Sequence, residues 1–262
     1  MRSRARSALA AALLLLTVTP VALGLAGLAG RLAPLPESTT VVAWTSDRGA
    51  FGGWSGFDLA PDGVAFRAVG DARVHTAGRL LREAGRLVGV EAQRPQWLPL
   101  DPRDAAEPEN GDAEGLALLP GGAHAVAFER FDRVVVYEAG AAPRRLPIPP
   151  AFSRLVVNRG LESLAADADG RLYTLPEGVG LPWRLPVWRY DGAWRIAFRL
   201  RTGLLWQPVG ADFGPRGQLY VLERRFLGLG FASRIRVLPL AESARAGRAR
   251  IVWRAPLGRH GN

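Results

Sequence analysis

A nine-residue pattern of apolar and polar positions recurs four times along the chain. It reads SGFDLAPDG at Ser55–Gly63, EGLALLPGG at Glu114–Gly122, ESLAADADG at Glu162–Gly170 and VGADFGPRG at Val209–Gly217, with starts 59, 48 and 47 residues apart. In each copy a short apolar run leads into a polar turn that ends on Gly, the residue that adopts positive φ most readily. A second apolar run follows each Gly, so the pattern predicts one β-hairpin per repeat.

Further β-branched or aromatic runs, bounded by Gly, Pro or Asp, supply the remaining strands. These candidates are residues 64–69, 73–75, 123–128, 133–137, 171–175, 185–190, 194–200, 218–222, 234–240 and 249–253. Residues 91–111 are rich in Pro, Asp and Glu and are predicted as a long connecting loop, which explains the longer first interval. A repeat of about 40 to 50 residues made of short strands predicts an all-β fold, a β-propeller of four-stranded blades.

The first thirty residues differ from the rest of the chain. Three arginines precede an apolar run over residues 8–16, and small residues follow it. This order predicts a secretory signal peptide over residues 1–30, and therefore a periplasmic or secreted protein. The alternative is an uncleaved anchor in the inner membrane, since residues 8–30 are long enough to span a bilayer. Residues 34–262 are predicted to form a single propeller domain without disulfides, because the chain has no Cys.

The formal net charge of +10 falls to about +7 without the three arginines of the leader. All 34 basic residues are Arg. They are spread along the sequence and form no recognised motif, so nucleic-acid binding is disfavoured. Guanidinium groups suit the oxygens of a phosphate-bearing substrate, and a small anionic ester is the partner that we expect. For most individual Arg, a solvated surface position is the simpler interpretation.

Acidic residues occupy recurring places in the repeat. Glu114 and Glu162 take its first position and Asp58 and Asp212 its fourth, and a third set lies six to eight residues beyond the closing Gly. That third set is Asp71, Glu129, Glu177 and Glu223. Equivalent positions of successive blades surround one axis, so these carboxylates can converge there. Converging carboxylates need a neutralising cation or Arg, and oxygen ligands favour Ca²⁺ or Mg²⁺ over Zn²⁺. Structural salt bridges with neighbouring Arg are the alternative.

Motifs of other catalytic classes are missing from the sequence. It has no G-x-S-x-G nucleophile elbow, and its three His stand far from one another at 75, 124 and 260. GLGF at 228–231 and GVGLP at 178–182 lack the strand-to-helix setting of a dinucleotide-binding loop. Hydrolysis through a serine triad, a zinc site and a nucleotide fold are therefore disfavoured.

Four segments together resemble the phytase-like family of exported bacterial proteins, described as having esterase-like activity of phytase. They are FGGWSGFDLAPDG, NGDAEGLALLPGG with AFERF, NRGLESLAADADGRLYTLPEG and QPVGADFGPRGQLYVLERRF, and the similarity covers about 44–253. The resemblance implies a propeller and a distant kinship to calcium-dependent propeller phytases, which hydrolyse phosphate monoesters. The residues that match its motifs are Glu114, Glu129, Arg130, Asn158, Glu162, Glu177, Asp212, Glu223, Arg224 and Arg225.

These residues define the expected site. We expect Glu114, Glu129, Glu162, Glu177 and Glu223 to bind Ca²⁺, Glu162, Glu114 and Asp212 to act in catalysis, and Arg130, Arg224, Arg225 and Asn158 to bind substrate. The expected activity is metal-assisted hydrolysis of phosphoric or other esters. A non-catalytic propeller that binds a ligand or a protein is the alternative. At about 48 residues per repeat, residues 34–262 hold fewer than five blades, so the count predicts a propeller that lacks its last blade.

Overall fold

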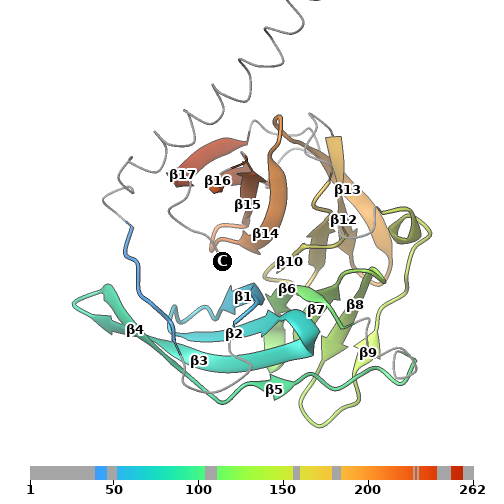
Figure 1. The fold of residues 1–262 in the computed structure, drawn as a ribbon. Coiled ribbons are helices and arrows are strands. Elements are labelled where there is room, and N and C mark those ends of the chain that lie inside the picture. The colour runs from blue at the N-terminus through green and yellow to red at the C-terminus, as the bar shows by residue number, and fades with distance from the viewer. Residues whose placement is uncertain are drawn as a thin grey trace, which may run out of the picture.

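The computed structural model describes residues 39–45, 52–103, 111–155, 160–178, 184–226, 228, 230–240 and 249–255. These residues form four antiparallel sheets arranged as the blades of a β-propeller (Figure 1). The predicted leader and Asn158 lie outside the described residues. Within the described part of the chain, no helix has the length and apolar character needed to cross a membrane.

Each blade is a meander in which consecutive strands pair. Blade 1 consists of β1 (Trp54–Leu59), β2 (Ala65–Gly70), β3 (Val74–Glu83) and β4 (Arg86–Ala92), with β5 (Gln96–Trp97) paired to β3. Blade 2 consists of β6 (Ala113–Leu118), β7 (His124–Phe128), β8 (Arg133–Tyr137) and β9 (Arg144–Arg145). Short 3-10 helices are η1 (Asp71–Arg73), η3 (Pro120–Gly122) and η4 (Phe152–Arg154).

Blades 3 and 4 repeat the plan of the first two. Blade 3 consists of β10 (Ser163–Ala166), β11 (Leu172–Leu175), β12 (Arg184–Tyr190) and β13 (Trp194–Arg201). Blade 4 consists of β14 (Gln207–Phe213), β15 (Gln218–Phe226), β16 (Phe231–Pro239) and β17 (Arg250–Ala255). The prediction of an all-β propeller with four-stranded blades is confirmed.

The four nine-residue copies form the innermost hairpin of each blade. Their first halves supply β1, β6, β10 and β14, which surround the axis (Figure 1). Along the chain, β1 contacts β6, β6 contacts β10, and β10 contacts β14. The closing glycines have φ of 69°, 88°, 77° and 72°, at Gly63, Gly122, Gly170 and Gly217 respectively. The predicted reason for Gly at these turns is therefore confirmed.

Apolar clusters between neighbouring blades hold three of the junctions together. Val69 of blade 1 packs with Leu116 and Phe128 of blade 2. Blades 2 and 3 share a cluster that includes Val134 and Trp188. A third cluster, between blades 3 and 4, also consists of buried apolar side chains. Because every blade buries its faces only against its neighbours, the core is distributed around the ring.

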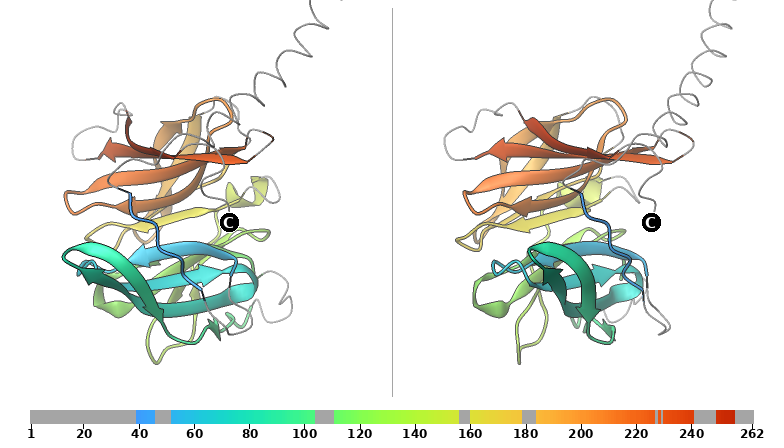
Figure 2. Two further views of the ribbon diagram at one scale, coloured as in Figure 1. Left: turned by 60° about the vertical axis from the view of Figure 1, so that its left-hand side comes forward. Right: turned by 90° about the vertical axis from the view of Figure 1, so that its left-hand side faces the viewer.

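Residues 39–45 connect the fourth blade to the first. The indole Nε1 of Trp253 in β17 donates to Thr39 Oγ1 over 3.0 Å. At the other end of this segment, the Trp44 ring stacks on Trp54 of β1 with a centroid separation of 5.2 Å. Figure 2 shows the segment, in blue, running between these two blades. The described residues thus form four blades, in agreement with the expected count of fewer than five, and this segment contacts both the fourth and the first.

One part of the first blade departs from the sequence prediction. Residues 73–75 were expected as a short strand, but β3 continues to Glu83 and pairs with β4, which was not predicted. The predicted loop 91–111 begins inside β4 and contains β5, which pairs with β3. These strands are largely exposed, so they lack the continuous apolar runs that identified the other strands.

Candidate functional site

Each inner hairpin has a turn at one end and an open end opposite. The first residue of the repeat lies at the open end, near the residues that follow the ladder on the second strand. In blades 1, 2 and 4 the register shifts at this first residue, which makes Ser55, Glu114 and Val209 the extra residue of a β-bulge. In blade 3 the equivalent residue, Glu162, directly precedes β10. Bulges redirect a side chain and often occur beside functional sites. Ser55, Glu114, Glu162 and Val209 are therefore equivalent positions around the axis.

The residues at the end of the second strands form a matching set. Pairing of Trp54 with Gly70 and of Ala113 with Phe128 places Asp71 and Glu129 one residue beyond the ladder. Glu177 has this place in blade 3, where its N–H donates to the carbonyl of Gly160, as the N–H of Glu129 donates to that of Asp112. In blade 4 Gln207 pairs with Arg224, so Arg224 takes the place that carboxylates occupy in the other blades.

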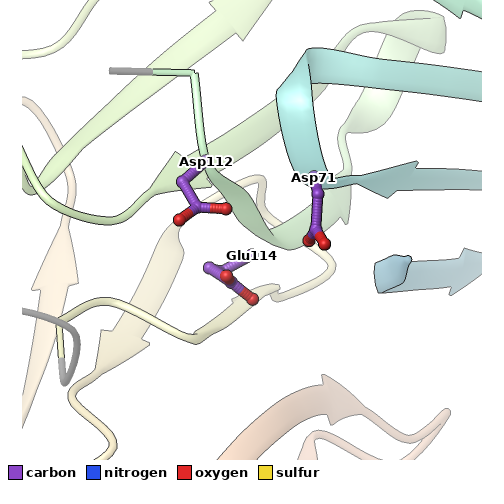
Figure 3. A group of neighbouring side chains, drawn as sticks. All are labelled: Asp71, Asp112 and Glu114. Carbon is purple, nitrogen blue, oxygen red and sulfur yellow. The ribbon is translucent and has the colours of Figure 1, made fainter. Parts of the chain in front are cut away.

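Three carboxylates converge between blades 1 and 2. Asp71 in η1, Asp112 just before β6 and Glu114 in β6 each offer one oxygen, and these three oxygens lie within 4.8 Å of one another. Figure 3 shows Asp112 and Glu114, at the start of β6, with Asp71 on a separate segment beside them. Ser55 Oγ donates to Asp71 Oδ1 over 3.3 Å and also hydrogen-bonds Glu114. We call Asp71, Asp112 and Glu114 the acidic triad.

A second acidic group, a pair of glutamates, lies in blade 3 near the acidic triad. Glu162 and Glu177 are both buried, and Arg224 of blade 4 approaches them to 3.7 and 3.4 Å. Between this pair and the triad, Glu129 accepts the backbone N–H of Gly160 over 2.9 Å. Arg130 lies 3.1 Å from Asp112. Six carboxylates from three blades thus face two guanidinium groups.

Burial and mutual repulsion favour the protonated forms of two of these carboxyl groups. Desolvation, followed by the charges of Asp112 and Glu129, raises the pKa of Glu114 to about 7. Desolvation and the charge of Glu177 raise the pKa of Glu162 to about 8, although Arg224 acts in the opposite direction. Glu114 and Glu129 also contribute to the shift of Glu162, so the group behaves as one electrostatic unit.

The acidic triad has the donor set and spacing that a hard divalent cation needs. Calcium binds oxygen ligands at about 2.3 to 2.6 Å, so two ligands on opposite sides of the ion are about 4.6 to 5.2 Å apart. The observed upper limit of 4.8 Å lies within that span. A cation there would also relieve the repulsion that raises the pKa of Glu114. The residues therefore fit Ca²⁺, with water completing the six to eight ligands that calcium takes.

Three other residues from the expected site lie elsewhere. Glu223 is fully buried, and both of its carboxylate oxygens accept hydrogen bonds from guanidinium groups, those of Arg234 and Arg236. Arg225 lies over the Trp206 ring, 4.7 Å from its centroid. Asp212 is in β14 at the fourth position of its repeat, and its charge acts on Asp58 rather than on the triad. Desolvation, opposed by the N–H of Leu118 and assisted by Asp212, raises the pKa of Asp58 to about 7.

Sequence reasoning missed Asp112 and did not place Asp71 among the ligands. Asp71 belongs to the recurring set beyond the closing Gly, so the repeat contained its signal. Asp112 has no counterpart in the other copies, and only its position two residues before Glu114 could have indicated it. Counting from the closing Gly shows why Arg224, and not Glu223, is the equivalent residue in blade 4. Glu129, Glu177 and Arg224 all stand seven residues beyond that Gly, whereas Glu223 stands six beyond.

Solved structures similar to the chain include several with low sequence identity. Virginiamycin B lyase from Staphylococcus aureus is 14% identical, with 73% of this chain and 57% of the lyase covered, at a TM-score of 0.39. The Cps50 (Swd1) β-propeller domain of Myceliophteria thermophila is 13% identical, with 77% and 57% covered, at a TM-score of 0.43. YCF48 from Cyanidioschyzon merolae is 7% identical, with 76% and 71% covered, at 0.42. The chain thus spans less than two thirds of the lyase and of the Cps50 domain.

No curated protein sequence matches the chain. The family of phytase-like proteins, described as "esterase-like activity of phytase", matches residues 49–255, which span all four blades. The match includes the acidic triad, the pair Glu162 and Glu177, and Arg224. The chain therefore belongs to the phytase-like family.

Proposed function

We propose that the protein is a divalent-cation-dependent hydrolase of phosphoric esters, with its site at the axial carboxylates. The observation that carries this proposal is the convergence of Asp71, Asp112 and Glu114, with one oxygen of each within 4.8 Å of the others. Membership of the phytase-like family supports an esterase-like activity in general. The phosphoric ester is favoured over other esters because guanidinium groups border the carboxylates.

The residues of the site have separate tasks in this proposal. The acidic triad would hold Ca²⁺, which supplies Lewis-acid polarisation of a phosphoryl oxygen when bound. Arg224 and Arg130 would bind further oxygens of the phosphoryl group, since guanidinium groups bind such oxygens with two hydrogen bonds. Their present carboxylate partners are partly exposed or shared, so each can reorient toward an arriving anion.

Glu162 is the candidate general base. It is buried, it lies within 3.7 Å of Arg224, and its pKa is raised to about 8. In its ionised form it would take a proton from the attacking water, and in its protonated form it would return that proton to the leaving alcohol. Proton transfer is most efficient when the pKa of the group lies near the working pH. Glu177, beside it, keeps that pKa high through its negative charge.

Two model substrates test the activity. Purified protein is assayed with p-nitrophenyl phosphate and p-nitrophenyl acetate, with calcium and after calcium removal. We expect hydrolysis of the phosphate ester that depends on calcium, and a loss of at least about 100-fold in Glu162→Gln, the usual contribution of a general base. The control is Glu138→Gln, which changes an exposed Glu of blade 2. If calcium binds and neither substrate is hydrolysed, the site is a binding site and the hydrolase proposal fails.

We also propose that the protein is exported. The support is the order of three arginines, an apolar run and small residues within residues 1–30. Fractionation of cells that express the full chain tests this, and protein confined to the cytoplasm would contradict it. Recovery in the membrane fraction would identify an uncleaved anchor instead.

A further inference from the structure

A groove between the outer strands of blades 3 and 4 gathers five arginines. Its volume is about 530 Å³, and its basic residues are Arg184 of β12, Arg199 and Arg201 of β13, and Arg234 and Arg236 of β16. None of the residues that line it belongs to the inner strands β1, β6, β10 or β14. The groove is therefore separate from the axial carboxylates. Arginines that are far apart in the sequence meet here because two blades pack side by side.

The described residues leave most of this positive charge unbalanced. Among the described residues Glu223 is the only carboxylate paired with any of the five, and Arg234 and Arg236 occupy both of its oxygens. Within the described ranges no carboxylate pairs with Arg184, Arg199 or Arg201. Arg184 and Arg201 also stand directly opposite each other on β12 and β13. Like charges in that arrangement destabilise a sheet unless an anion lies between them.

Arg236 provides an independent indication of a missing partner. Only 8% of this residue is exposed, and its Nε is a buried donor without a hydrogen-bond acceptor. Its two other nitrogens are engaged, one by the carbonyl of Arg201 and one by Glu223. A buried donor without a partner costs free energy, so a ligand oxygen would improve this site.

Two guanidinium groups of the groove, those of Arg234 and Arg236, are held in place before any ligand arrives. Arg234 lies over the Trp206 ring, 4.0 Å from its centroid, and donates through Nε to Glu223. A Cβ at Gly203 would lie 3.0 Å from Trp206 Cδ1 and 3.4 Å from Arg234 Nη2. The absence of a side chain at Gly203 therefore lets Trp206 and Arg234 approach each other. Donors that are already oriented lose less entropy on binding.

We propose that this groove is an anion-binding site for a compact, multiply charged oxyanion of the phosphoryl or sulfuryl class. Planar guanidinium groups bind such tetrahedral groups through paired hydrogen bonds. Five arginines and one buried carboxylate give the groove a net positive charge, so it can accept an anion with more than one negative charge. The bound anion would bridge β12 and β13 of blade 3 to β16 of blade 4. It would therefore stabilise the junction between these two blades.

Calorimetric titration with inorganic pyrophosphate, and separately with sulfate, tests this site in buffer freed of divalent cations. We expect saturable binding with a Kd below about 1 mM for at least one of the two anions. The double variant Arg184→Gln/Arg201→Gln should weaken this binding at least about tenfold, since two charge-assisted contacts are removed. Both side chains are exposed, so the fold is expected to persist, and circular dichroism checks this. The anion that binds more tightly identifies the class of the natural ligand.

The matched control is Arg86→Gln/Arg216→Gln, which removes two exposed arginines of blades 1 and 4 outside the groove. Binding by this control should stay within about twofold of the unmodified protein. Equal weakening in the two double variants would show attraction to net charge alone and overturn the proposal. No saturable binding of either anion would overturn it as well. Since no divalent cation and no ester cleavage is involved, this result is independent of the proposed hydrolase activity.

Discussion

The fourth blade differs from the first three at the residue that lies opposite the position two residues before each repeat. Blades 1 to 3 place a carboxylate there, at Asp71, Glu129 and Glu177, whereas blade 4 places Arg224. The neighbouring Glu223 is buried between Arg234 and Arg236. A shift of one residue thus decides whether a carboxylate belongs to an acidic group at the axis or to a salt bridge inside a blade. The same side chain has a different chemistry because its electrostatic surroundings differ.

The difference also makes the two sides of the axis electrostatically unequal. The acidic triad lies between blades 1 and 2, and the acidic pair with Arg224 lies where blade 3 meets blade 4. A cation therefore fits the side of the acidic triad, where Arg130 lies beside Asp112, and Arg224 supplies positive charge on the other side. If all four blades had the same residue at this place, the axis would have no separate sites for a cation and for an anionic group. This asymmetry is what the proposed binding of a phosphoric ester requires.

The largest effect is expected when the buried carboxylate of blade 4 is neutralised. Glu223→Gln leaves two nearly buried guanidinium groups without their counter-charge. Loss of one partner from a buried ion pair typically costs about 3 to 5 kcal/mol of unfolding free energy. Urea denaturation without divalent cations measures this loss. Glu177→Gln is the matched control, and its cost should be clearly smaller, because Arg224 is partly exposed and the change also removes the repulsion between Glu177 and Glu162. Equal losses would remove the distinction between the two carboxylates.

A smaller effect concerns pH. The pKa of Glu162 is raised from 4.5 to about 8 by desolvation and by Glu177, with further contributions from Glu114 and Glu129 and opposition from Arg224. The folded protein then binds more protons than the unfolded chain between these values, so stability is present below pH 4.5 and is lost as the pH rises toward 8. Melting temperatures of the cation-free protein should therefore fall across this range. Glu162→Gln should reduce the slope, and an unchanged slope would contradict the raised pKa.

The smallest effect is expected for Arg224→Gln. This change removes the positive charge beside Glu162 and Glu177, and should lower the stability of the cation-free protein by about 1 kcal/mol at pH 8, since the pairs are partly exposed. Calcium should then stabilise the variant at least as much as the unmodified protein, because the acidic triad is intact. A variant that no longer responds to calcium would show that the triad is not the cation site.

The sequence was sufficient for the fold because the nine-residue copies contain both the inner strand and the turn. It was also sufficient to expect carboxylates at equivalent places, since Glu114 and Glu162 repeat with the period. The sequence could not identify Asp112 as part of the site, because this residue has no counterpart in the other copies. It could not place Glu223 either, because the pairing register of β14 with β15 decides whether Glu223 or Arg224 takes the axial place. The arginine groove could not be predicted either: Arg184, Arg201 and Arg236 meet only through strand pairing and the packing of two blades.

The most direct test of the central claim is a calcium titration of the melting temperature at pH 8, on the unmodified protein, Glu114→Gln and Glu138→Gln. A ligand that binds only the folded state stabilises it by about 2.7 kcal/mol at 100 times its Kd, which is a shift of several degrees for a protein of this size. We predict this shift for the unmodified protein and for Glu138→Gln, and little or none for Glu114→Gln. Equal shifts in all three proteins, or no shift in any of them, would contradict a cation site at the acidic triad.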